Sequence, residues 1–193
     1  MPKLRPILFN TEMVKAILDG HKTETRRVIK QVSPDAKKLD TLWPTPPYCI
    51  GDYLYVRETY CPLDIDHVIN GEKYVYKADC TAESECVRKE LGYKWRPSIH
   101  MPKEAARLFL KVENVKIRHL RGMQKRDFQN EGLASGAALV GDMEMCEEEF
   151  KLLWNSTVSD PRYKWENDPW VWVIQFKVVD RKEVKLWLKE NAE

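Results

Sequence analysis

The segment GHKTETRRVI, residues 20–29, decides how this chain is interpreted. Gly20 and His21 form a turn signal, because glycine adopts backbone angles that end a helix. The residues from Lys22 to Ile29 include several β-branched side chains, which favour an extended conformation. The segment therefore predicts a turn that leads directly into a β-strand.

Strand alternation distributes the polar side chains of this segment over two faces. One face receives Thr23, Thr25 and Arg27, and the other receives Glu24 and Arg26. Lys22 and Thr25 are three residues apart, so a continuous strand would direct them to opposite sides. They converge only if Lys22 still belongs to the turn after Gly20, and the sequence permits that geometry.

The segments around this turn indicate a mixture of short helices and separated strands. A short amphipathic helix is predicted at 12–19, with Thr11 as its N-cap, and prolines disfavour regular structure over much of 31–48. Strands are predicted at 53–58, 73–77, 108–113, 115–118 and 170–178, and helices at 124–131, 145–154 and 181–191. Residues 62–94 are mostly polar and weakly patterned, which is typical of an insertion between core strands.

This element order favours an α+β domain built on a small curled sheet or barrel. Strict alternation of strands and helices is lacking, which disfavours a doubly wound parallel sheet. We expect one domain over residues 1–179, with the insertion at about 62–94, and a C-terminal helical tail over 180–193. A length of 193 residues suits one domain of this kind.

Composition narrows the function classes. The longest apolar run that we find, Trp170 to Ile174, is far too short to cross a bilayer, and no secretory signal pattern opens the chain. The five cysteines show no C-x-x-C spacing, so we interpret them as reduced thiols. We therefore expect a soluble cytoplasmic protein without a membrane partner. No motif for a metal or a cofactor is present, and we predict neither.

Charge is distributed unevenly although the net charge is only +2. Residues 1–38 are rich in lysine and arginine, and a second basic stretch contains Arg118, Arg121, Lys125 and Arg126. Such segregation is compatible with a positive face that binds a polyanion, and equally with ordinary solvated charge.

The turn-and-strand segment resembles the signature of the ASCH domains, a family of PUA-like barrels. The signature G-x-K-x-x-T-x-R is matched by Gly20, Lys22, Thr25 and Arg27. Further segments resemble the phage and prophage branch of the family: GDYLYVRE at 51–58, WRPSIHMP at 95–102, the pair Glu131-Gly132, and PWVWV at 169–173. Together they cover most of residues 7–178.

The resemblance implies a small β-barrel with flanking short helices and a cleft for a nucleoside, a nucleotide or RNA. It also implies a bacterial or phage-encoded protein. Some small bacterial relatives are amidohydrolases that remove the acyl group from N4-acylated cytidine, for example N4-acetylcytidine. They use a lysine, the signature threonine and a glutamate, and these roles fall on Lys22, Thr25 and Glu131.

This chemistry requires an unusual lysine. A threonine hydroxyl is a poor nucleophile unless a neighbouring base removes its proton, and Lys22 is a base only when neutral. Burial, or repulsion from Arg26 or Arg27, would have to lower the Lys22 pKa. Glu131 would then protonate the departing amine or activate water. Arg27 or main-chain N–H groups would stabilise the oxyanion.

Other interpretations of the same residues stay open. Lys22 can simply pair with Glu24 or another carboxylate, and Thr25 can be an ordinary strand residue. The cleft can belong to a non-catalytic RNA-binding module in which arginines contact phosphates and Tyr53 or Tyr55 stacks on a base. A ribonuclease is the third alternative, and nothing in the sequence separates it from amide hydrolysis.

Four further residues are candidates for substrate or RNA binding besides Arg26 and Arg27. They are Arg57, Glu58, Tyr55 and His100. For each there is a structural alternative: Arg57 and Glu58 can form an ion pair, Tyr55 can belong to the core, and His100 can be a satisfied structural residue. The large side chains of Trp154, Trp165, Trp170 and Trp172 are predicted to lie in the core.

Overall fold

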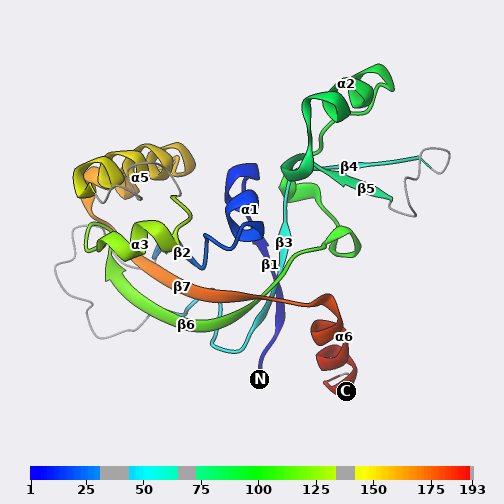
Figure 1. Cartoon of the computed structure of the whole chain (residues 1–193). Helices are drawn as coiled ribbons and strands as arrows, with labels where there is room; N and C mark the ends of the chain where they lie inside the picture. Colours follow the sequence, from blue (N-terminus) through cyan, green and yellow to red (C-terminus); the bar gives the residue numbers. More distant parts are fainter. Residues whose placement is uncertain (31–43, 65–72, 134–141, 192–193) are drawn as a thin grey trace.

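A computed structural model describes residues 1–30, 44–64, 73–133 and 142–191. Its main feature is a five-stranded sheet in the order β1-β3-β6-β7-β2 (Figure 1). The strands are β1 (Leu4–Leu8), β2 (Glu24–Val28), β3 (Tyr53–Arg57), β6 (Phe109–His119) and β7 (Trp170–Val179). β1 and β3 are parallel, and the other neighbours are antiparallel.

The two long strands β6 and β7 form a curved ribbon on which the rest of the sheet is built (Figure 1). Their register shifts between Val112 and Asn114, where an extra residue forms a bulge. Such bulges bend a strand and increase its twist. β3 pairs with the part of β6 before the bulge, whereas β2 pairs with Val171 to Gln175 of β7. The bend therefore divides the sheet into two ends, with β3 paired at one end and β2 at the other.

The sheet is mixed and open. β1 and β2 are its edge strands, and within the described ranges no strand pairing joins them. The predicted α+β class is confirmed, but a closed barrel is not observed. The physical reason is that β2 pairs with one end of the β6–β7 ribbon, whereas β3, which carries β1, pairs with the other end. The backbones of the two edge strands β1 and β2 therefore do not pair.

Most predicted elements are present. The helices are α1 (Thr11–Leu18), α2 (Ala82–Glu90), α3 (Lys125–Asn130), α5 (Met143–Thr157) and α6 (Arg181–Glu190). The N-cap of α1 is Asn10 rather than Thr11, since the Asn10 side chain accepts from the Met13 amide. Residues 108–118, predicted as a strand or a strand pair, form the single bulged strand β6. Part of the proline-rich stretch, 31–43, lies outside the described residues.

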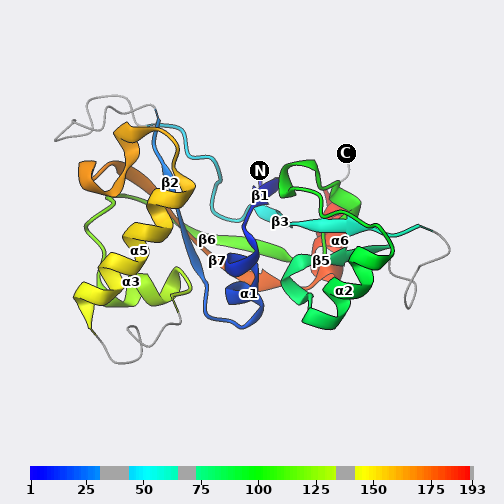
Figure 2. The ribbon, with the colours of Figure 1, turned by 90° about the horizontal axis from the view of Figure 1, so that it is seen from above.

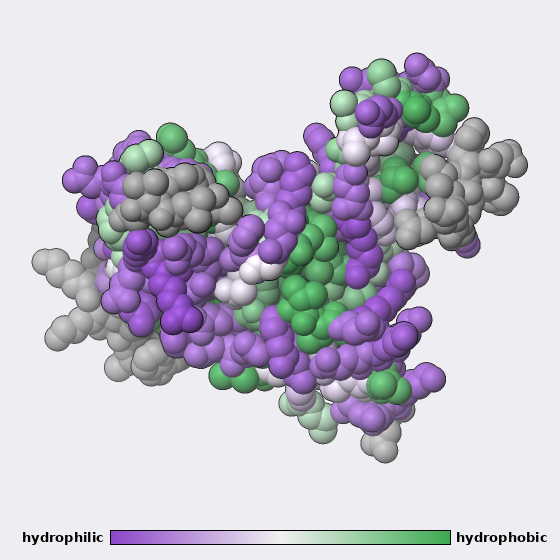
Figure 3. Space-filling view, viewed as in Figure 1, coloured by the Kyte–Doolittle hydropathy of each residue, from purple (hydrophilic) through white to green (hydrophobic). Residues whose placement is uncertain are grey.

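The region predicted as an insertion contains structure of its own. β4 (Tyr60–Pro62) and β5 (Tyr74–Tyr76) form a separate two-stranded sheet, and α2 follows it. None of the α2 side chains is buried, and the helix projects from the body of the molecule (Figure 1). The face seen in Figure 3 carries an apolar area at its centre, flanked by hydrophilic side chains.

Three groups of buried side chains hold the elements together. The central group lies under α1 and joins β1, β3, β6 and β7 through residues such as Ile7, Leu54 and Ile174. A second group packs α3 and α5 against one end of the ribbon, and a third packs α6 at the other end. Figure 2 shows these two ends on opposite sides of α1. The helices α3 and α5 thereby become a wall beside β2.

The tryptophan prediction is largely confirmed. Trp154, Trp165 and Trp172 are buried, and Trp170 is half-buried against the central group. At the other end, α6 buries Val184 and places Trp187 4.9 Å from the Tyr53 ring. No helix in the ranges that the structure describes is long and apolar enough to cross a bilayer.

Two glycines with positive φ define how α1 and α3 meet. Gly20 ends α1 at φ +76°, with open space where a Cβ would stand. Gly132, at φ +91° after α3, is different: a Cβ there would lie 2.8 Å from the Ala16 Cβ and 3.0 Å from the Lys22 Cβ. The end of α3 therefore docks against the end of α1 only because residue 132 has no side chain.

We predict that Gly132→Ala destabilises the protein far more than Gly20→Ala. The positive φ alone costs about 1 kcal/mol at either position, and overpacking adds about 2 kcal/mol at Gly132. Urea unfolding of the two variants measures this difference. Equal losses of unfolding free energy would contradict the close approach of α1 and α3.

Candidate functional site

Lys22 is placed by the C-terminal turn of α1. The amides of His21 and Lys22 both donate to the Ala16 carbonyl oxygen at 2.9 Å, so Lys22 still belongs to that turn. The strand pairing of β2 starts only at Glu24. This is the geometry that the spacing of Lys22 and Thr25 requires if the two are to serve one site.

The turn brings Lys22 to the end of α3. The Thr23 amide donates to the Asn130 carbonyl at 2.9 Å, and Lys22 forms an isolated antiparallel bridge with Glu131. The Lys22 Nζ lies 2.5 Å from Glu131 Oε2 and 2.8 Å from the Glu131 carbonyl oxygen. The exposed fractions of the two side chains are 0% and 4%. Lys22 and Glu131 therefore form a buried ion pair between segments 109 residues apart.

Arg26 binds the other oxygen of Glu131. Its Nη1 lies 2.9 Å from Glu131 Oε1 and 2.8 Å from Glu24 Oε1, and its Nη2 lies 3.8 Å from Asp127 Oδ2. Glu24 also accepts from Gln175 Nε2 at 2.9 Å, across the β2–β7 pair. Glu131 thus has one cation on each carboxylate oxygen, which fixes its orientation.

The pair perturbs both of its members. Burial lowers the pKa of Lys22, against the attraction of Glu131, and the charges of Arg27 and Arg26 lower it further. Burial alone would raise the pKa of Glu131, but Lys22 and Arg26 outweigh it and bring that pKa below its ordinary value. Glu131 is therefore a carboxylate at neutral pH, beside a lysine that gives up its proton more readily than in water.

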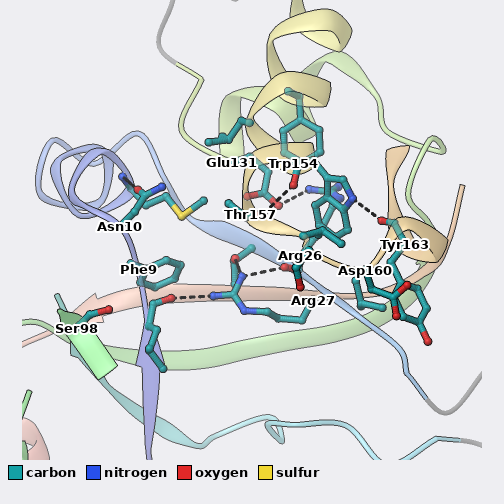
Figure 4. Close-up of a pocket in the computed structure, with 18 of the residues that line it drawn as sticks. Phe9, Asn10, Arg26, Arg27, Ser98, Glu131, Trp154, Thr157, Asp160 and Tyr163 are labelled. Carbon is teal, nitrogen blue, oxygen red and sulfur yellow. Dashed lines mark hydrogen bonds and ion pairs between the residues drawn. The ribbon is translucent and has the colours of Figure 1, made fainter. Parts of the chain in front are cut away.

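A cleft of about 870 Å³ opens beside this pair, between β2 and the α5 wall (Figure 4). Thr25, Arg26, Arg27 and Glu131 line it from β2 and the end of α3. The opposite walls come from the end of β1, from the C-terminal half of α5 and from the loop after it. They include Phe9, Asn10, Leu153, Trp154, Thr157, Asp160, Arg162 and Tyr163. Lys22 is not among the lining residues and stands behind Glu131.

Thr25 and Arg27 share one face of β2, as strand alternation predicts. Arg27 Nη1 donates to Thr25 Oγ1 at 2.6 Å, and Arg27 Nη2 donates to the Leu8 carbonyl at 3.1 Å. The Arg27 guanidinium lies 5.4 Å from the Phe9 ring centre. Within the described ranges no hydrogen bond joins Thr25 to Lys22 or to Glu131, although Thr25 and Glu131 line the same cleft.

The structure therefore brings five of the predicted site residues together. They are Lys22, Thr25, Arg26, Arg27 and Glu131. The interpretation that Lys22 pairs with a carboxylate is also correct, but its partner is Glu131 rather than Glu24. Pairing and a role in the cleft are compatible, because Glu131 also lines the cavity.

Four predicted binding residues lie outside the lining of this cleft. Arg57 donates to the carbonyls of Met101 and Ile99, at 2.8 and 2.5 Å, and so holds the turn at 99–101. Glu58 is buried and bound by Arg107 through two hydrogen bonds of 3.0 and 3.1 Å. Arg57 and Glu58 thus have separate partners rather than the mutual ion pair considered above.

Tyr55 and His100 also make structural contacts and do not line the cleft. Tyr55 is half-buried and packs against the third group of core residues. His100 is exposed, and its carbonyl accepts from the Tyr60 hydroxyl at 3.0 Å. Neither residue is part of the lining of the cavity, which the sequence pattern alone did not reveal.

Sequence reasoning missed the walls of the cleft. Phe9 and Asn10 lie at the junction of β1 and α1, and β1 itself was not predicted because Pro6 interrupts it. An edge strand tolerates such a proline, since one side of its backbone has no partner. The polar loop residues Asp160 and Arg162 carry no motif. Within the described ranges, no group of three histidine, cysteine, aspartate or glutamate side chains is arranged to hold a metal.

Comparison with known proteins finds similar solved structures, and the two described below are among them. No family model and no curated protein matches the chain. A protein from Enterococcus faecalis of the DUF984 family is similar over 93% of this chain and 81% of its own, with 12% identity and a TM-score of 0.44. An ASCH domain from Lactobacillus crispatus is similar over 91% and 79%, with 13% identity and a TM-score of 0.40. Likeness at this level of identity does not indicate a function for this chain, whereas the geometry of the site limits the chemistry that it can perform.

We predict that Glu131→Gln lowers the free energy of unfolding by about 3–5 kcal/mol, because it leaves Lys22 buried without a counter-charge. Asp127→Asn, whose carboxylate is 3.8 Å from Arg26 and partly exposed, is the matched control and is expected to cost less than about 1 kcal/mol. Urea unfolding at pH 7 measures both.

The stabilisation by the Lys22–Glu131 pair is expected to depend on pH. Because the Glu131 pKa is lowered in the folded state, its stabilisation is present above the unfolded-state value of about 4.3 and is lost as pH falls through the folded-state value. The difference between wild type and Glu131→Gln is therefore expected to shrink below about pH 4. A difference that stays constant down to the acid unfolding transition would contradict an ionised Glu131.

Proposed function

We propose that the cleft binds a nucleoside and hydrolyses an acyl amide on its base, of the kind found in N4-acetylcytidine. The observation that carries this proposal is the position of Glu131: one carboxylate oxygen is held by buried Lys22, and the residue lines the same cavity as Thr25. A nucleophile and an acid–base pair on one cavity are what amide hydrolysis needs.

Charge balance supports a neutral ligand at the inner end of the cleft. Lys22, Arg26 and Arg27 carry formal positive charges there, and Glu24, Asp127 and Glu131 carry formal negative charges. Arg26 contacts all three carboxylates, and Arg27 is bound to Thr25 and Leu8. The charge of Arg26 is thus compensated by carboxylates, and the N–H groups of Arg27 are already bound. Such a site suits an uncharged base better than a phosphate.

In the proposed reaction Thr25 Oγ1 attacks the acyl carbon and forms an ester, while the bond from that carbon to the amide nitrogen breaks. The proton that leaves the hydroxyl is passed by the Glu131 carboxylate to the departing nitrogen. Water then hydrolyses the ester, which releases the carboxylic acid and restores the hydroxyl.

The surrounding cations have defined parts in this scheme. The N–H group of Arg27 that donates to Thr25 Oγ1 favours its ionised form and makes its proton easier to remove. Lys22 contributes through its short hydrogen bond to Glu131, along which a proton can move. Its lowered pKa means that the pair is poised to exchange that proton. Lys22 thus acts behind Glu131 rather than directly on Thr25.

We predict that the protein hydrolyses N4-acetylcytidine to cytidine and that Thr25→Val lowers kcat by at least about 100-fold. Valine keeps the shape of the side chain and removes only the nucleophile. Thr25→Ser is the matched control and is expected to keep activity within about tenfold. Chromatography of the products measures the rate. Activity that survives in Thr25→Val would exclude Thr25 as the nucleophile.

Binding of an RNA strand without chemistry is the second candidate, favoured by the exposed cations Lys30 and Arg162 on the lining of the cleft. The other basic residues considered for this role, Arg118, Arg121 and Lys125, are exposed and lie outside that lining. The two candidates differ in their dependence on salt.

We predict that cytidine binding changes less than about twofold between 50 and 200 mM salt, because a neutral ligand releases few counterions. A strand that makes three phosphate contacts would lose about 20-fold over the same range. Calorimetric titration with cytidine and with a short single-stranded RNA makes the comparison. Tight, steeply salt-dependent binding of the RNA together with undetectable cytidine binding would favour the second candidate, and cleavage of that RNA would indicate a ribonuclease.

A further inference from the structure

A third carboxylate, Glu24, lies beside the proposed catalytic group and is not used by the scheme above. Its side chain is 1% exposed, and among the described residues its one cationic contact is the Arg26 Nη1 that also binds Glu131. Neither Glu24 nor Arg26 occupies a fixed position of the G-x-K-x-x-T-x-R signature. These two residues therefore belong to this chain's own version of the site.

The geometry makes Arg26 a shared partner. Its Nη1 stands 2.8 Å from Glu24 Oε1 and 2.9 Å from Glu131 Oε1, so one nitrogen bridges two buried carboxylates. The Glu24 oxygen is close enough for an ion pair but receives no aligned hydrogen bond from the described residues, whereas its other oxygen accepts from Gln175. A buried carboxylate oxygen without an aligned donor lacks one of the hydrogen bonds that would favour the ionised form.

We infer that Arg26 is a positioning residue for Glu131, and that protonation of Glu24 tightens its hold on that carboxylate. The consequence for catalysis rests on the proposed function, while the coupling between the two carboxylates does not. With Glu24 ionised, the Arg26 Nη1 is shared between the Glu24 and Glu131 carboxylates. With Glu24 protonated, the Arg26 Nη1 has Glu131 as its one charged neighbour among the described residues, while its Nη2 stays 3.8 Å from Asp127, and Glu131 becomes a weaker base.

The surroundings of Glu24 agree with this inference. Burial raises its pKa, and the Glu131 and Asp127 charges from α3 act in the same direction. Arg26 on its own strand and the hydrogen bond from Gln175 on β7 oppose them, without cancelling the rise. Glu24 therefore titrates above the ordinary glutamate range, while Glu131 stays ionised across the same range.

The direct test is a carbon-13 NMR titration of the glutamate carboxyl signals in wild type, Glu24→Gln and Asp127→Asn. The Glu131 signal is expected to shift in wild type with the same midpoint as Glu24, although Glu131 itself does not titrate there. Glu24→Gln, which mimics the protonated carboxyl, is expected to abolish that step. Asp127→Asn, the control for loss of a nearby charge, is expected to retain it.

A Glu131 signal that stays flat through the Glu24 titration in folded wild type would overturn the inference. So would a step that persists in Glu24→Gln. A merely structural role for Glu24 predicts lower stability in Glu24→Gln without any change in this step, so the experiment separates the two roles.

Activity supplies the second readout. The kcat/KM for N4-acetylcytidine is expected to rise about threefold to tenfold through the Glu24 midpoint, and Glu24→Gln is expected to lose that rise. An inactive wild type that still shows the coupled NMR step would refute the proposed function and leave the positioning role of Arg26 standing. An active wild type without the coupled step would refute the positioning role of Arg26 and leave the proposed function standing.

Discussion

The buried pair of Lys22 and Glu131 is the interaction on which the site depends. Taking a lysine and a glutamate out of water is costly unless each finds its partner with good geometry. Here the turn after α1 and the end of α3 must meet for the pair to form, and Gly132 permits that meeting. The pair thus links the local chain geometry of two distant segments to the shape of one cleft.

The arrangement holds Glu131 rigidly beside a cavity, and this suits the proton transfer that the proposed reaction requires. Glu131 has a cation on each oxygen, so its orientation is fixed, yet it faces a cavity that a ligand can enter. Lys22 is buried, and burial lowers its pKa. A lysine on the solvated surface would not undergo this shift. A preorganised charged group beside a cavity is a common feature of catalytic sites.

The sequence predicted the local features of this site better than its surroundings. Strand alternation predicted that Thr25 and Arg27 share a face, and the sequence permitted Lys22 to lie in the turn after Gly20, because both are matters of local backbone geometry. Local patterns could not identify the carboxylate that pairs with Lys22, because Glu131 lies 109 residues further along the chain. The element order left a curled sheet or a barrel open, the family resemblance implied the barrel, and the bulged ribbon of β6 and β7 carries an open sheet instead. Helix α2 was missed because it buries no apolar side chain.

The most direct test of this account is a double-mutant cycle on the central pair. Unfolding free energies of wild type, Lys22→Met, Glu131→Gln and the double variant isolate the interaction between the two side chains. The account predicts a favourable coupling of about 2–3 kcal/mol, with the double variant more stable than the sum of the single losses implies. A coupling near zero would mean that Lys22 and Glu131 do not depend on each other, and would contradict the account.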